Sequence, residues 1–551
     1  MIIKRIHLIF LLLNIIFIPS CNNESPTDSN RIIIGISADV ESLNPLYSFN
    51  VVEGNITELL YLSLVEHRWN DDGNISTLPM LAERWEWNED STSITIRLRE
   101  DVYWTDSMLV TADDVVFSFD AYSDPDIQSR MYGTFTDFYT ENDMSIDLNK
   151  TFTVQSPFIF TIHFNKTAVP DLFSIDLPII PKHIYENVDR KNFAASEKVL
   201  PVVTNGAFQF DRWDKNQSII LKSNPASFLY SSSSVDEIIF KVVPDYNSRL
   251  TQLKNGEIDM MEDIKPDDID ELKKIENLTI APLHGREYEY VGWSNIDLKA
   301  FEEDKIVPHK FFGNARVRKA LTYAINRDEI LNEYLNGFGE VASGPVSPIF
   351  KDAVDNSLKP YEYNPAMAKA ILAEEGWRDT DNDGVLEKGN EEFAFTLYIA
   401  GGNPRRSFAA TLIKNNLKAV GIDVSISTLE LGVFIENLYT KKMDAWIASW
   451  FVPIPVDLKT YWFSDLQSTP LNLVNYQNRK ADEILLRLEG KIHPEEKNKL
   501  YKEFQKIMHE DQPVSFMYWI DNITAYNNRI KNVNVNPLGF IHHCWEWETA
   551  E

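Results

Sequence analysis

Cysteine is scarce in this chain: only Cys21 and Cys544 occur among its 551 residues. Disulfides therefore form no framework for the fold, and we expect Cys544 to be an unpaired structural thiol. Hydrophobic residues make up 44 % of the chain, which supplies large packed cores and excludes a mainly disordered protein. The length is several times that of one typical domain, so we expect more than one domain.

Basic residues are also few. Lys and Arg number 53 against 83 Asp and Glu, and the net charge is −30. Phosphate backbones repel a protein of this charge, because nucleic-acid binders gain affinity by neutralising phosphates. We therefore expect no nucleic-acid partner.

The common catalytic signatures are missing. The chain contains no G-x-S-x-G elbow, no H-E-x-x-H pair and no phosphate loop ending in Gly-Lys-Ser/Thr. Carboxylate pairs such as Asp113 with Asp114 arise by chance among 83 acids, so they are weak indicators of glycoside hydrolysis. These observations predict a protein that is not an enzyme.

Only one long apolar run is present, at residues 8–18, and it follows Lys4 and Arg5. It is too short to cross about 30 Å of hydrocarbon and is typical of a secretory signal. It ends in Pro19-Ser20-Cys21, which resembles a bacterial lipobox. We interpret residues 1–20 as a signal peptide, Cys21 as the lipidated residue and residues 21–30 as a polar tether. An ordinary signal with an incidental cysteine is the alternative.

This N-terminus predicts a lipid-anchored protein of the bacterial cell envelope. It would be extracytoplasmic, on the periplasmic side or at the cell surface. The sequence leaves open whether the anchor lies in the inner or the outer membrane.

Strand and helix patterns alternate along the rest of the chain. Residues 32–36 are continuously apolar, and residues 94–99 alternate apolar and polar side chains, as strands do. One helix is expected at residues 314–335. Two others begin at Asn364-Pro365 and Asn403-Pro404, and their ends are marked by Gly376 and Gly421. This alternation predicts an α/β fold.

One segment has the pattern of a calcium loop. Asp379, Asp381 and Asp383 place oxygens at alternate positions before Gly384. Position twelve is Asn390 where such a loop needs Glu, although Glu387, Glu391 or Glu392 could substitute. The segment is therefore either a structural calcium site or a solvated acidic turn. The pair His542-His543 is a weaker metal candidate, because neighbouring side chains on a strand point to opposite faces.

Aromatic residues gather at residues 446–476, together with Pro453 and Pro455. Rigid segments of this kind can line a cleft that receives an extended or apolar ligand. Trp450 and Phe451 are therefore candidate ligand-binding residues. The alternative is that these rings are core.

Several motifs resemble those of the extracellular solute-binding proteins of family 5, the peptide, dipeptide and nickel receptors of ABC importers. They cover nearly the whole chain that follows the signal. The motifs are LAERWE at 81–86, LVTADDVVFS at 109–118, NGAF at 205–208, ARVRKAL at 315–321, AINR at 324–327, YNP at 363–365 and VGI at 420–422.

The resemblance implies a two-lobed periplasmic-binding-protein type II fold with an extra domain inserted in the first lobe. The first lobe would comprise residues 31–60, 205–289 and 518–551, the inserted subdomain 61–204, and the second lobe 290–517. The chain would cross between the lobes near residues 290–293 and 516–518. A ligand in the cleft would stabilise the closed state by its higher affinity for that state.

The resemblance also implies ligand contacts. Peptide binders of the family commonly hold the ligand amine with an acidic residue shortly after the tryptophan that corresponds to Trp450. Here Pro455 stands in place of the first acid, which leaves Asp457. Arg405 and Arg406 are candidates for a ligand carboxylate, or are merely solvated. Trp293, on the first crossing, is a further candidate.

We therefore expect a lipid-anchored solute-binding protein of an ABC importer that captures oligopeptides and delivers them to a membrane permease with its ATPase. We expect a monomer that requires no cofactor apart from the candidate structural calcium. The alternatives are a non-peptide solute such as a metal chelate or oligosaccharide, a sensory receptor and, less favoured, an envelope hydrolase.

Overall fold

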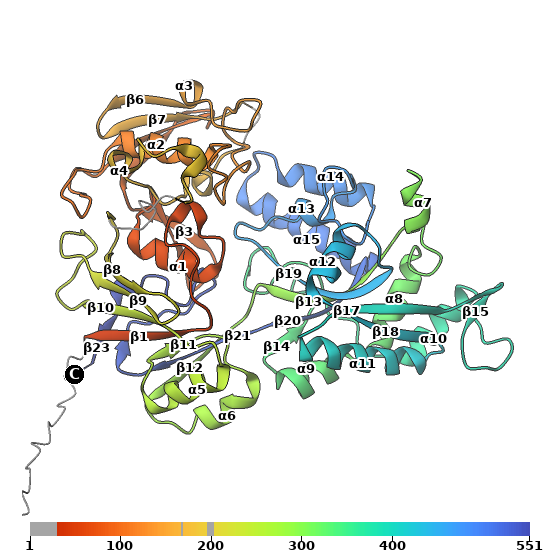
Figure 1. Cartoon of the computed structure of the whole chain (residues 1–551). Helices are drawn as coiled ribbons and strands as arrows, with labels where there is room; N and C mark the ends of the chain where they lie inside the picture. The colour runs from red at the N-terminus through yellow and green to blue at the C-terminus, as the bar shows by residue number, and fades with distance from the viewer. Residues whose placement is uncertain (1–29, 167–168, 196–202, 551) are drawn as a thin grey trace, which may run out of the picture.

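The computed structural model describes residues 30–166, 169–195 and 203–550 and shows two lobes (Figure 1). A seven-stranded sheet forms the centre of the first lobe, on the left of the figure, and a six-stranded sheet that of the second, on the right. The predicted two-lobed α/β fold is confirmed. We use "first lobe" for the described residues before 284 and after 521, and "second lobe" for residues 287–520.

The first-lobe sheet is mixed. The apolar run at its start forms β1, in which Ile32, Ile34 and Ile36 are buried, and β1 pairs in parallel with β10 and β11. The strands, in sheet order, are β12 (Leu278–Leu283), β21 (Asn522–Asn527), β11 (Met260–Met261), β1 (Arg31–Ile36), β10 (Glu237–Val242), β9 (Ser218–Ser223) and β8 (Phe208–Asp214). The helices of this part are α1 (Val51–Leu60), α5 (Tyr246–Asn255) and α6 (Ile269–Leu272).

A second group of elements lies between α1 and β8 in the sequence. Its strands are β2 (Val65–Trp69), β3 (Ile75–Pro79), β4 (Ala82–Trp87), β5 (Ser93–Leu98), β6 (Phe152–Ser156) and β7 (Ile159–His163), and its helices are α2 (Ala112–Ser123), α3 (Leu148–Thr151) and α4 (Lys182–Tyr185). The strands β4, β5, β7 and β6 form one sheet, whose buried residues share one core with β1 and β10. Thr111 and Asp114 close the start of α2 as a capping box.

The second-lobe sheet contains, in order, β14 (Gly339–Val341), β20 (Val514–Ile520), β13 (Glu287–Trp293), β19 (Ala445–Phe451), β17 (Ala394–Ala400) and β18 (Asp423–Leu429). The helices of this lobe are α7 (Leu298–Glu302), α8 (Ala315–Ala324), α9 (Arg327–Leu335), α10 (Pro365–Glu374), α11 (Pro404–Lys418), α12 (Leu431–Tyr439), α13 (Lys459–Trp462), α14 (Arg479–Leu488) and α15 (Pro494–Asp511). Gly292 lies opposite Trp446 in this sheet, and a β-carbon there would approach the indole to 2.4 Å. Only glycine fits at this position.

The capping signals of α10 and α11 are confirmed, because Asn364 and Asn403 accept hydrogen bonds from the backbone of the first helical turn. The single helix expected at residues 314–335 is wrong. The chain forms α8 and α9 instead, since Ile325 takes an extended conformation and the Asn326 side chain caps a new helix by accepting from the Glu329 amide.

The chain passes between the lobes at residues 284–286 and at Asp521. The predicted crossings at 290–293 and 516–518 are wrong, because these residues lie inside β13 and β20 of the second-lobe sheet. Both strands are buried on both faces. Their sequences are therefore continuously apolar and cannot be distinguished by pattern from an extended crossing segment, which explains the wrong prediction.

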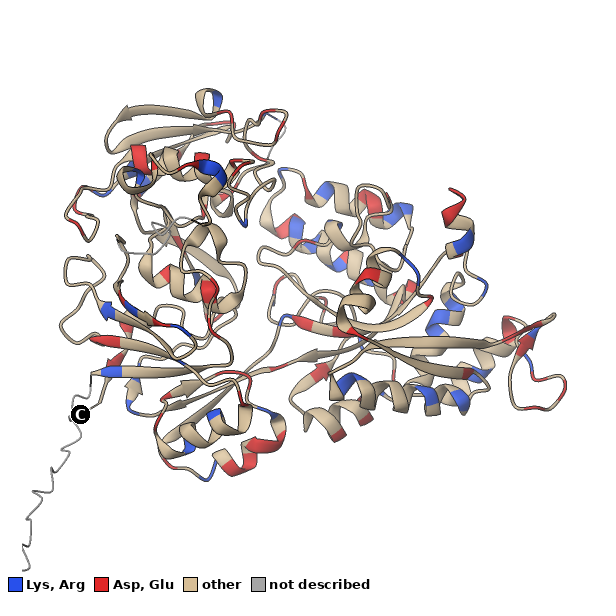
Figure 2. Ribbon diagram, viewed as in Figure 1, with Lys and Arg blue, Asp and Glu red and all other residues tan. Residues whose placement is uncertain are grey.

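The described helices include none that is both long and apolar enough to span a bilayer. Figure 2 shows Lys and Arg interspersed among Asp and Glu on both lobes. After β21 the chain ends in the first lobe with the short pair β22 (Ile530–Lys531) and β23 (Glu548–Thr549). Cys544 is fully buried there with a free thiol, as predicted.

Candidate ligand-binding cleft

A cavity of about 260 Å³ lies where the two lobes meet, and we call it the interlobe cavity. Most of its wall comes from the first lobe, including Glu58 on α1 and Asp176. Arg286, on the first crossing, and Ile454, just after β19 of the second lobe, complete it. A ligand here would touch both lobes, as closure around a solute requires.

A second cavity of about 180 Å³ adjoins the first, and Phe173 and Ile454 line both. Its first-lobe wall is the β2–β3 turn at Gly73. Its second-lobe wall includes Phe350 and Tyr501. The two cavities together provide space along the lobe boundary for a ligand longer than either alone.

The lobes also contact each other directly, apart from the crossings. Lys351 donates to the carbonyl oxygen of Asp71 over 2.7 Å, and the rings of Trp69 and Phe350 meet edge to face. Gly73, at φ +85°, lies against the backbone of the second lobe, and a β-carbon there would be 2.9 Å from the Ile349 carbonyl oxygen. The β2–β3 hairpin and residues 349–351 therefore form a contact that holds the lobes together, which we call the hairpin contact.

Two carboxyl groups of the interlobe cavity have raised pKa values. Burial, followed by repulsion from Asp176, raises the pKa of Glu58 to about 7. Burial raises the pKa of Asp176 to about 6, against the lowering effects of Ser63 and Arg130. Both acids would become more fully ionised if a cation bound beside them.

Two histidines and one arginine also line the interlobe cavity. Burial lowers the pKa of His67 to about 4 and that of His542 to about 3, so both are neutral at pH 7. His67 stacks on Phe173, with ring centroids 3.7 Å apart. Burial lowers the pKa of Arg286 to about 10, which leaves it charged.

Of the two aromatic candidates, only Phe451 contacts a residue that lines this cavity. Trp450 is half-buried in the second lobe, where it stacks on Tyr290 and contacts Tyr461. Phe451 is 48 % exposed, and the guanidinium of Arg286 lies 4.2 Å from its ring centroid. Phe451 therefore orients a residue of the cavity wall, whereas Trp450 packs within its lobe.

The charged candidates have partners inside the protein. Asp457 accepts hydrogen bonds from the amide and the hydroxyl of Thr460. Arg405 and Arg406 both pair with the fully buried Glu289, at 3.1 and 3.0 Å. These three candidates stay predictions, but both arginines are ion-paired, the Asp457 carboxylate is hydrogen-bonded, and none of the three lines the interlobe cavity.

Glu289 receives a third contact, from the Tyr518 hydroxyl at 2.6 Å.

Trp293 is completely buried, and its indole nitrogen donates to Ser515 over 3.1 Å. A residue so enclosed cannot touch a ligand in this arrangement of the lobes.

His542 and His543 are not on a strand: His543 has φ +61° and pairs with Glu66, while His542 faces the interlobe cavity.

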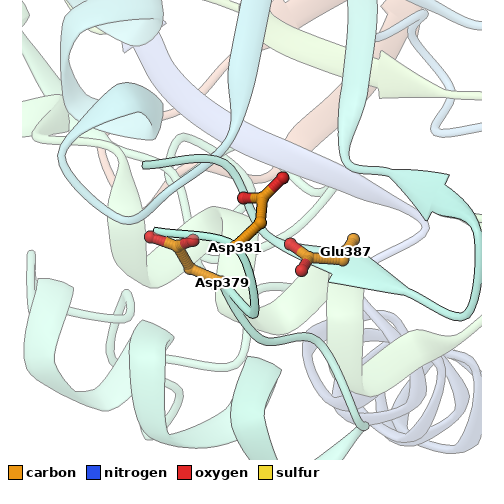
Figure 3. A group of neighbouring side chains, drawn as sticks. All are labelled: Asp379, Asp381 and Glu387. Atoms are coloured by element: carbon orange, nitrogen blue, oxygen red, sulfur yellow. The ribbon is translucent and has the colours of Figure 1, made fainter. Parts of the chain in front are cut away.

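The calcium-like segment lies outside both cavities, in the second lobe before β15 (Glu387–Lys388) and β16 (Glu391–Glu392). Carboxylate oxygens of Asp379, Asp381 and Glu387 lie within 4.8 Å of one another (Figure 3). Asp383 is not part of this group; its carboxylate accepts from the Val385 amide. Glu387 also accepts hydrogen bonds from Thr380. The group could hold a cation, but its geometry does not identify one.

The sequence did not indicate Glu58, Asp176 or Arg286. These three come from separate segments, and each belongs to a residue type that is common on surfaces. Of the ionisable residues that line the interlobe cavity, the sequence indicated only His542, which it suggested as a weak metal ligand. Their shared cavity depends on how the lobes meet, which no local pattern reveals.

Comparisons with known proteins agree with this architecture. The oligopeptide-binding protein AppA of Bacillus subtilis is 26 % identical over 531 residues, which cover 96 % of this chain and 93 % of that protein. Its structure in complex with a nonapeptide matches with a TM-score of 0.71 over 95 % of this chain and 99 % of that one. Heme-binding protein A of Haemophilus influenzae is 25 % identical over 496 residues, covering 88 % of this chain and 86 % of that protein.

The structure of NikZ from Campylobacter jejuni in complex with Ni(L-His) has the same fold, with a TM-score of 0.72 at 24 % identity over 95 % of this chain and all of that one. The model of the bacterial extracellular solute-binding proteins, family 5, matches residues 77–469. The chain thus belongs to the family 5 bacterial extracellular solute-binding proteins, which bind solutes for transport and are not enzymes.

Proposed function

We propose that this protein is the lipid-anchored, extracytoplasmic receptor of an ABC importer and that it captures peptides between its lobes. A permease and its ATPase in the membrane would receive the peptide when the lobes open. The observation that supports this most is the interlobe cavity, to whose wall both lobes contribute and which carries acidic side chains and a guanidinium group suited to the two ends of a peptide. The receptor would act as a monomer.

The hairpin contact supports capture by closure. The β2–β3 hairpin contacts the second lobe through Trp69, Asp71 and Gly73. Their partners, residues 349–351, are distant in the sequence from both crossings. A ligand that bridges the cavity walls would add to these contacts only when the lobes are closed. Affinity would then depend on both the cavity and the hairpin contact.

The anchor rests on the sequence alone, because Cys21 lies outside the described residues. Acyl chains on Cys21 would hold the protein at the membrane without a spanning helix. Capture would require no resident cofactor. The group Asp379, Asp381 and Glu387 lies away from the cavities, so a calcium ion there would be structural.

A non-peptide solute such as a metal chelate is the second candidate. Neutral His67 and His542 line the interlobe cavity and could complete the coordination of a chelated metal. Relatives that bind heme or Ni(L-His) show that such ligands occur among similar proteins. Peptide is favoured because Glu58, Asp176 and Arg286 offer charges to both termini.

Uptake measurements test the proposal. A strain that lacks the gene should import a radiolabelled random peptide mixture more slowly than its parent, and the wild-type gene should restore the rate. Normal uptake in the deletion strain, combined with loss of a cellular response to peptides, would indicate a sensory receptor. Normal uptake and responses, together with failure to import a metal chelate, would favour the second candidate.

A further inference from the structure

A third cavity lies beside the two described above, and we call it the third cavity. Its volume is about 420 Å³, larger than that of either of the others. Its wall belongs to the first lobe and consists of Thr77 on β3, Trp87 at the end of β4, Ser91 in the turn before β5, and residues 170–173. Apart from Phe173, none of these residues lines either of the other cavities. A substitution at any of them therefore alters the third cavity alone.

All three cavities meet at the ring of Phe173. This ring lies flat on His67, with centroids 3.7 Å apart and planes 9° from parallel. The backbone beneath it is fixed, because the Asp171 carboxylate accepts hydrogen bonds from the amides of Phe173 and Ser174. The Ser174 hydroxyl in turn donates to Asp137 over 2.6 Å. A ligand that extends from the interlobe cavity into the third cavity must therefore pass the ring of Phe173.

The second lobe reaches the rim of the third cavity. Lys491, in the loop between α14 and α15, donates to the carbonyl oxygen of Asp90, which is next to the wall residue Ser91. Lys497 on α15 lines the second cavity together with Phe173. The third cavity thus lies at the lobe boundary, although its wall comes from one lobe. A ligand held between the lobes can enter it without leaving that boundary.

The wall of the third cavity is mainly apolar. Its apolar side chains are those of Trp87, Pro170, Leu172 and Phe173. The Thr77 hydroxyl is already in contact with Nδ1 of His67, at 3.0 Å, and the Asp171 carboxylate is hydrogen-bonded to the backbone. The described residues that line the cavity include no lysine or arginine. This wall suits a bulky apolar group, which is stabilised when it is removed from water.

We infer that the third cavity is a specificity subsite for a bulky apolar side chain of a peptide that lies in the interlobe cavity and passes Phe173. This inference rests on the proposed peptide-receptor function and adds which peptides the receptor prefers. An extended peptide advances about 3.3 Å per residue, so a ligand that spans adjoining cavities needs several residues. The preferred ligands are then peptides longer than a dipeptide that carry an apolar residue at one fixed position.

Hexapeptide libraries test the subsite on the full-length protein in detergent. Each library fixes one position as Phe, Leu or Ser and randomises the other five, and competition with a labelled random hexapeptide mixture measures its affinity. At one position the wild type should bind the Phe and Leu libraries about ten-fold more tightly than the Ser library, because burial of an apolar side chain favours binding. The differences at the other positions should be smaller.

Variants of the wall locate this preference. Leu172→Ser and Trp87→Ser should each reduce it to about three-fold or less, because they make the wall polar. Trp87→Phe keeps the wall apolar and should retain the preference. Leu486→Ser, the matched control, makes the same change as Leu172→Ser at a residue that is 52 % exposed and lines none of the three cavities. It should leave the preference unchanged, and thermal unfolding checks that each variant is folded.

The Ser libraries provide the internal control. Leu172→Ser and Trp87→Ser should bind them as tightly as the wild type does, because serine gains nothing from an apolar wall. Weaker binding of the Ser libraries, equal to the loss for the Phe libraries, would show that these residues act through the fold and would overturn the subsite. Hexapeptide binding without an apolar preference, or with one that both variants retain, would also overturn it but would leave the peptide receptor intact. If the wild type bound no hexapeptide, the proposed function would fail and the subsite with it.

Discussion

The indole ring of Trp69 and the phenyl ring of Phe350 meet edge to face across the lobe boundary, with their centroids 6.0 Å apart and their planes at 60°. Trp69 ends β2 in the first lobe, and Phe350 follows β14 in the second. This ring pair, with the hydrogen bond from Lys351 to Asp71, brings the lobes together beside the two cavities. It exists only when the lobes are close, so it contributes to the affinity even of a ligand confined to the interlobe cavity, which neither ring lines.

Removing this ring pair should weaken ligand binding. Trp69→Leu and Phe350→Ala should each lower peptide affinity about 2- to 10-fold, because an edge-to-face aromatic pair contributes about 0.5–1.5 kcal/mol. Titration calorimetry measures the change. Phe408→Ala, which removes a ring pair inside the second lobe, is the control and should leave affinity unchanged. Equal affinities for all three variants and the wild type would show that the hairpin contact plays no part in closure.

The network around Glu289 should act on stability. Arg406→Ala should lower the free energy of unfolding by about 1.5–3 kcal/mol, since it removes one charged hydrogen bond to a fully buried carboxylate that Arg405 and Tyr518 still contact. Urea unfolding measures this, with Arg479→Ala, at an exposed ion pair, as the control expected to change little. Peptide affinity should stay the same in both. A loss of affinity without a loss of stability would instead return Arg406 to the role of a ligand contact.

The sequence predicted the elements better than it predicted the site. Asn364-Pro365, Asn403-Pro404 and the capping box at Thr111 define helix starts because their hydrogen bonds are local. The interruption between α8 and α9 at Asn326 was not predicted, because apolar residues continue at helical spacing on both sides of it. The crossings were misplaced because a strand buried on both faces and an extended crossing share one pattern.

The site depended on contacts that are distant in sequence. Arg405 and Arg406 looked available to a ligand, yet Glu289, more than a hundred residues earlier, compensates both of them. Glu58 and Asp176 lie far apart in the sequence, and only the fold places both on the wall of one cavity. Such relationships follow from the packing of lobes, which sequence spacing does not encode.

The stability of the empty protein should depend on pH through Glu58. Its pKa is about 7 in the folded protein against 4.5 in the unfolded chain, so the folded state binds more protons between these values. Stability should therefore fall as pH rises from about 4.5 to 7, and Asp176, with a pKa of about 6 against 3.8, adds to the fall. The melting temperature of ligand-free Glu58→Gln should fall less than that of the wild type over this range. Parallel melting curves for the two proteins would contradict the raised pKa of Glu58.

Cys21→Ser should abolish lipid attachment. Cells that express the wild type should incorporate radioactive palmitate into the protein, and the variant should remain unlabelled and leave the membrane fraction. Cys544→Ser is the matched control, because a buried thiol in the folded body is no acceptor for lipid. Palmitate labelling of the Cys21 variant would refute the anchor.

Native mass spectrometry of the full-length protein, purified in detergent without refolding, tests the central claim most directly. The account predicts a series of bound masses that fragment as short peptides. A single bound mass that is not a peptide would contradict it.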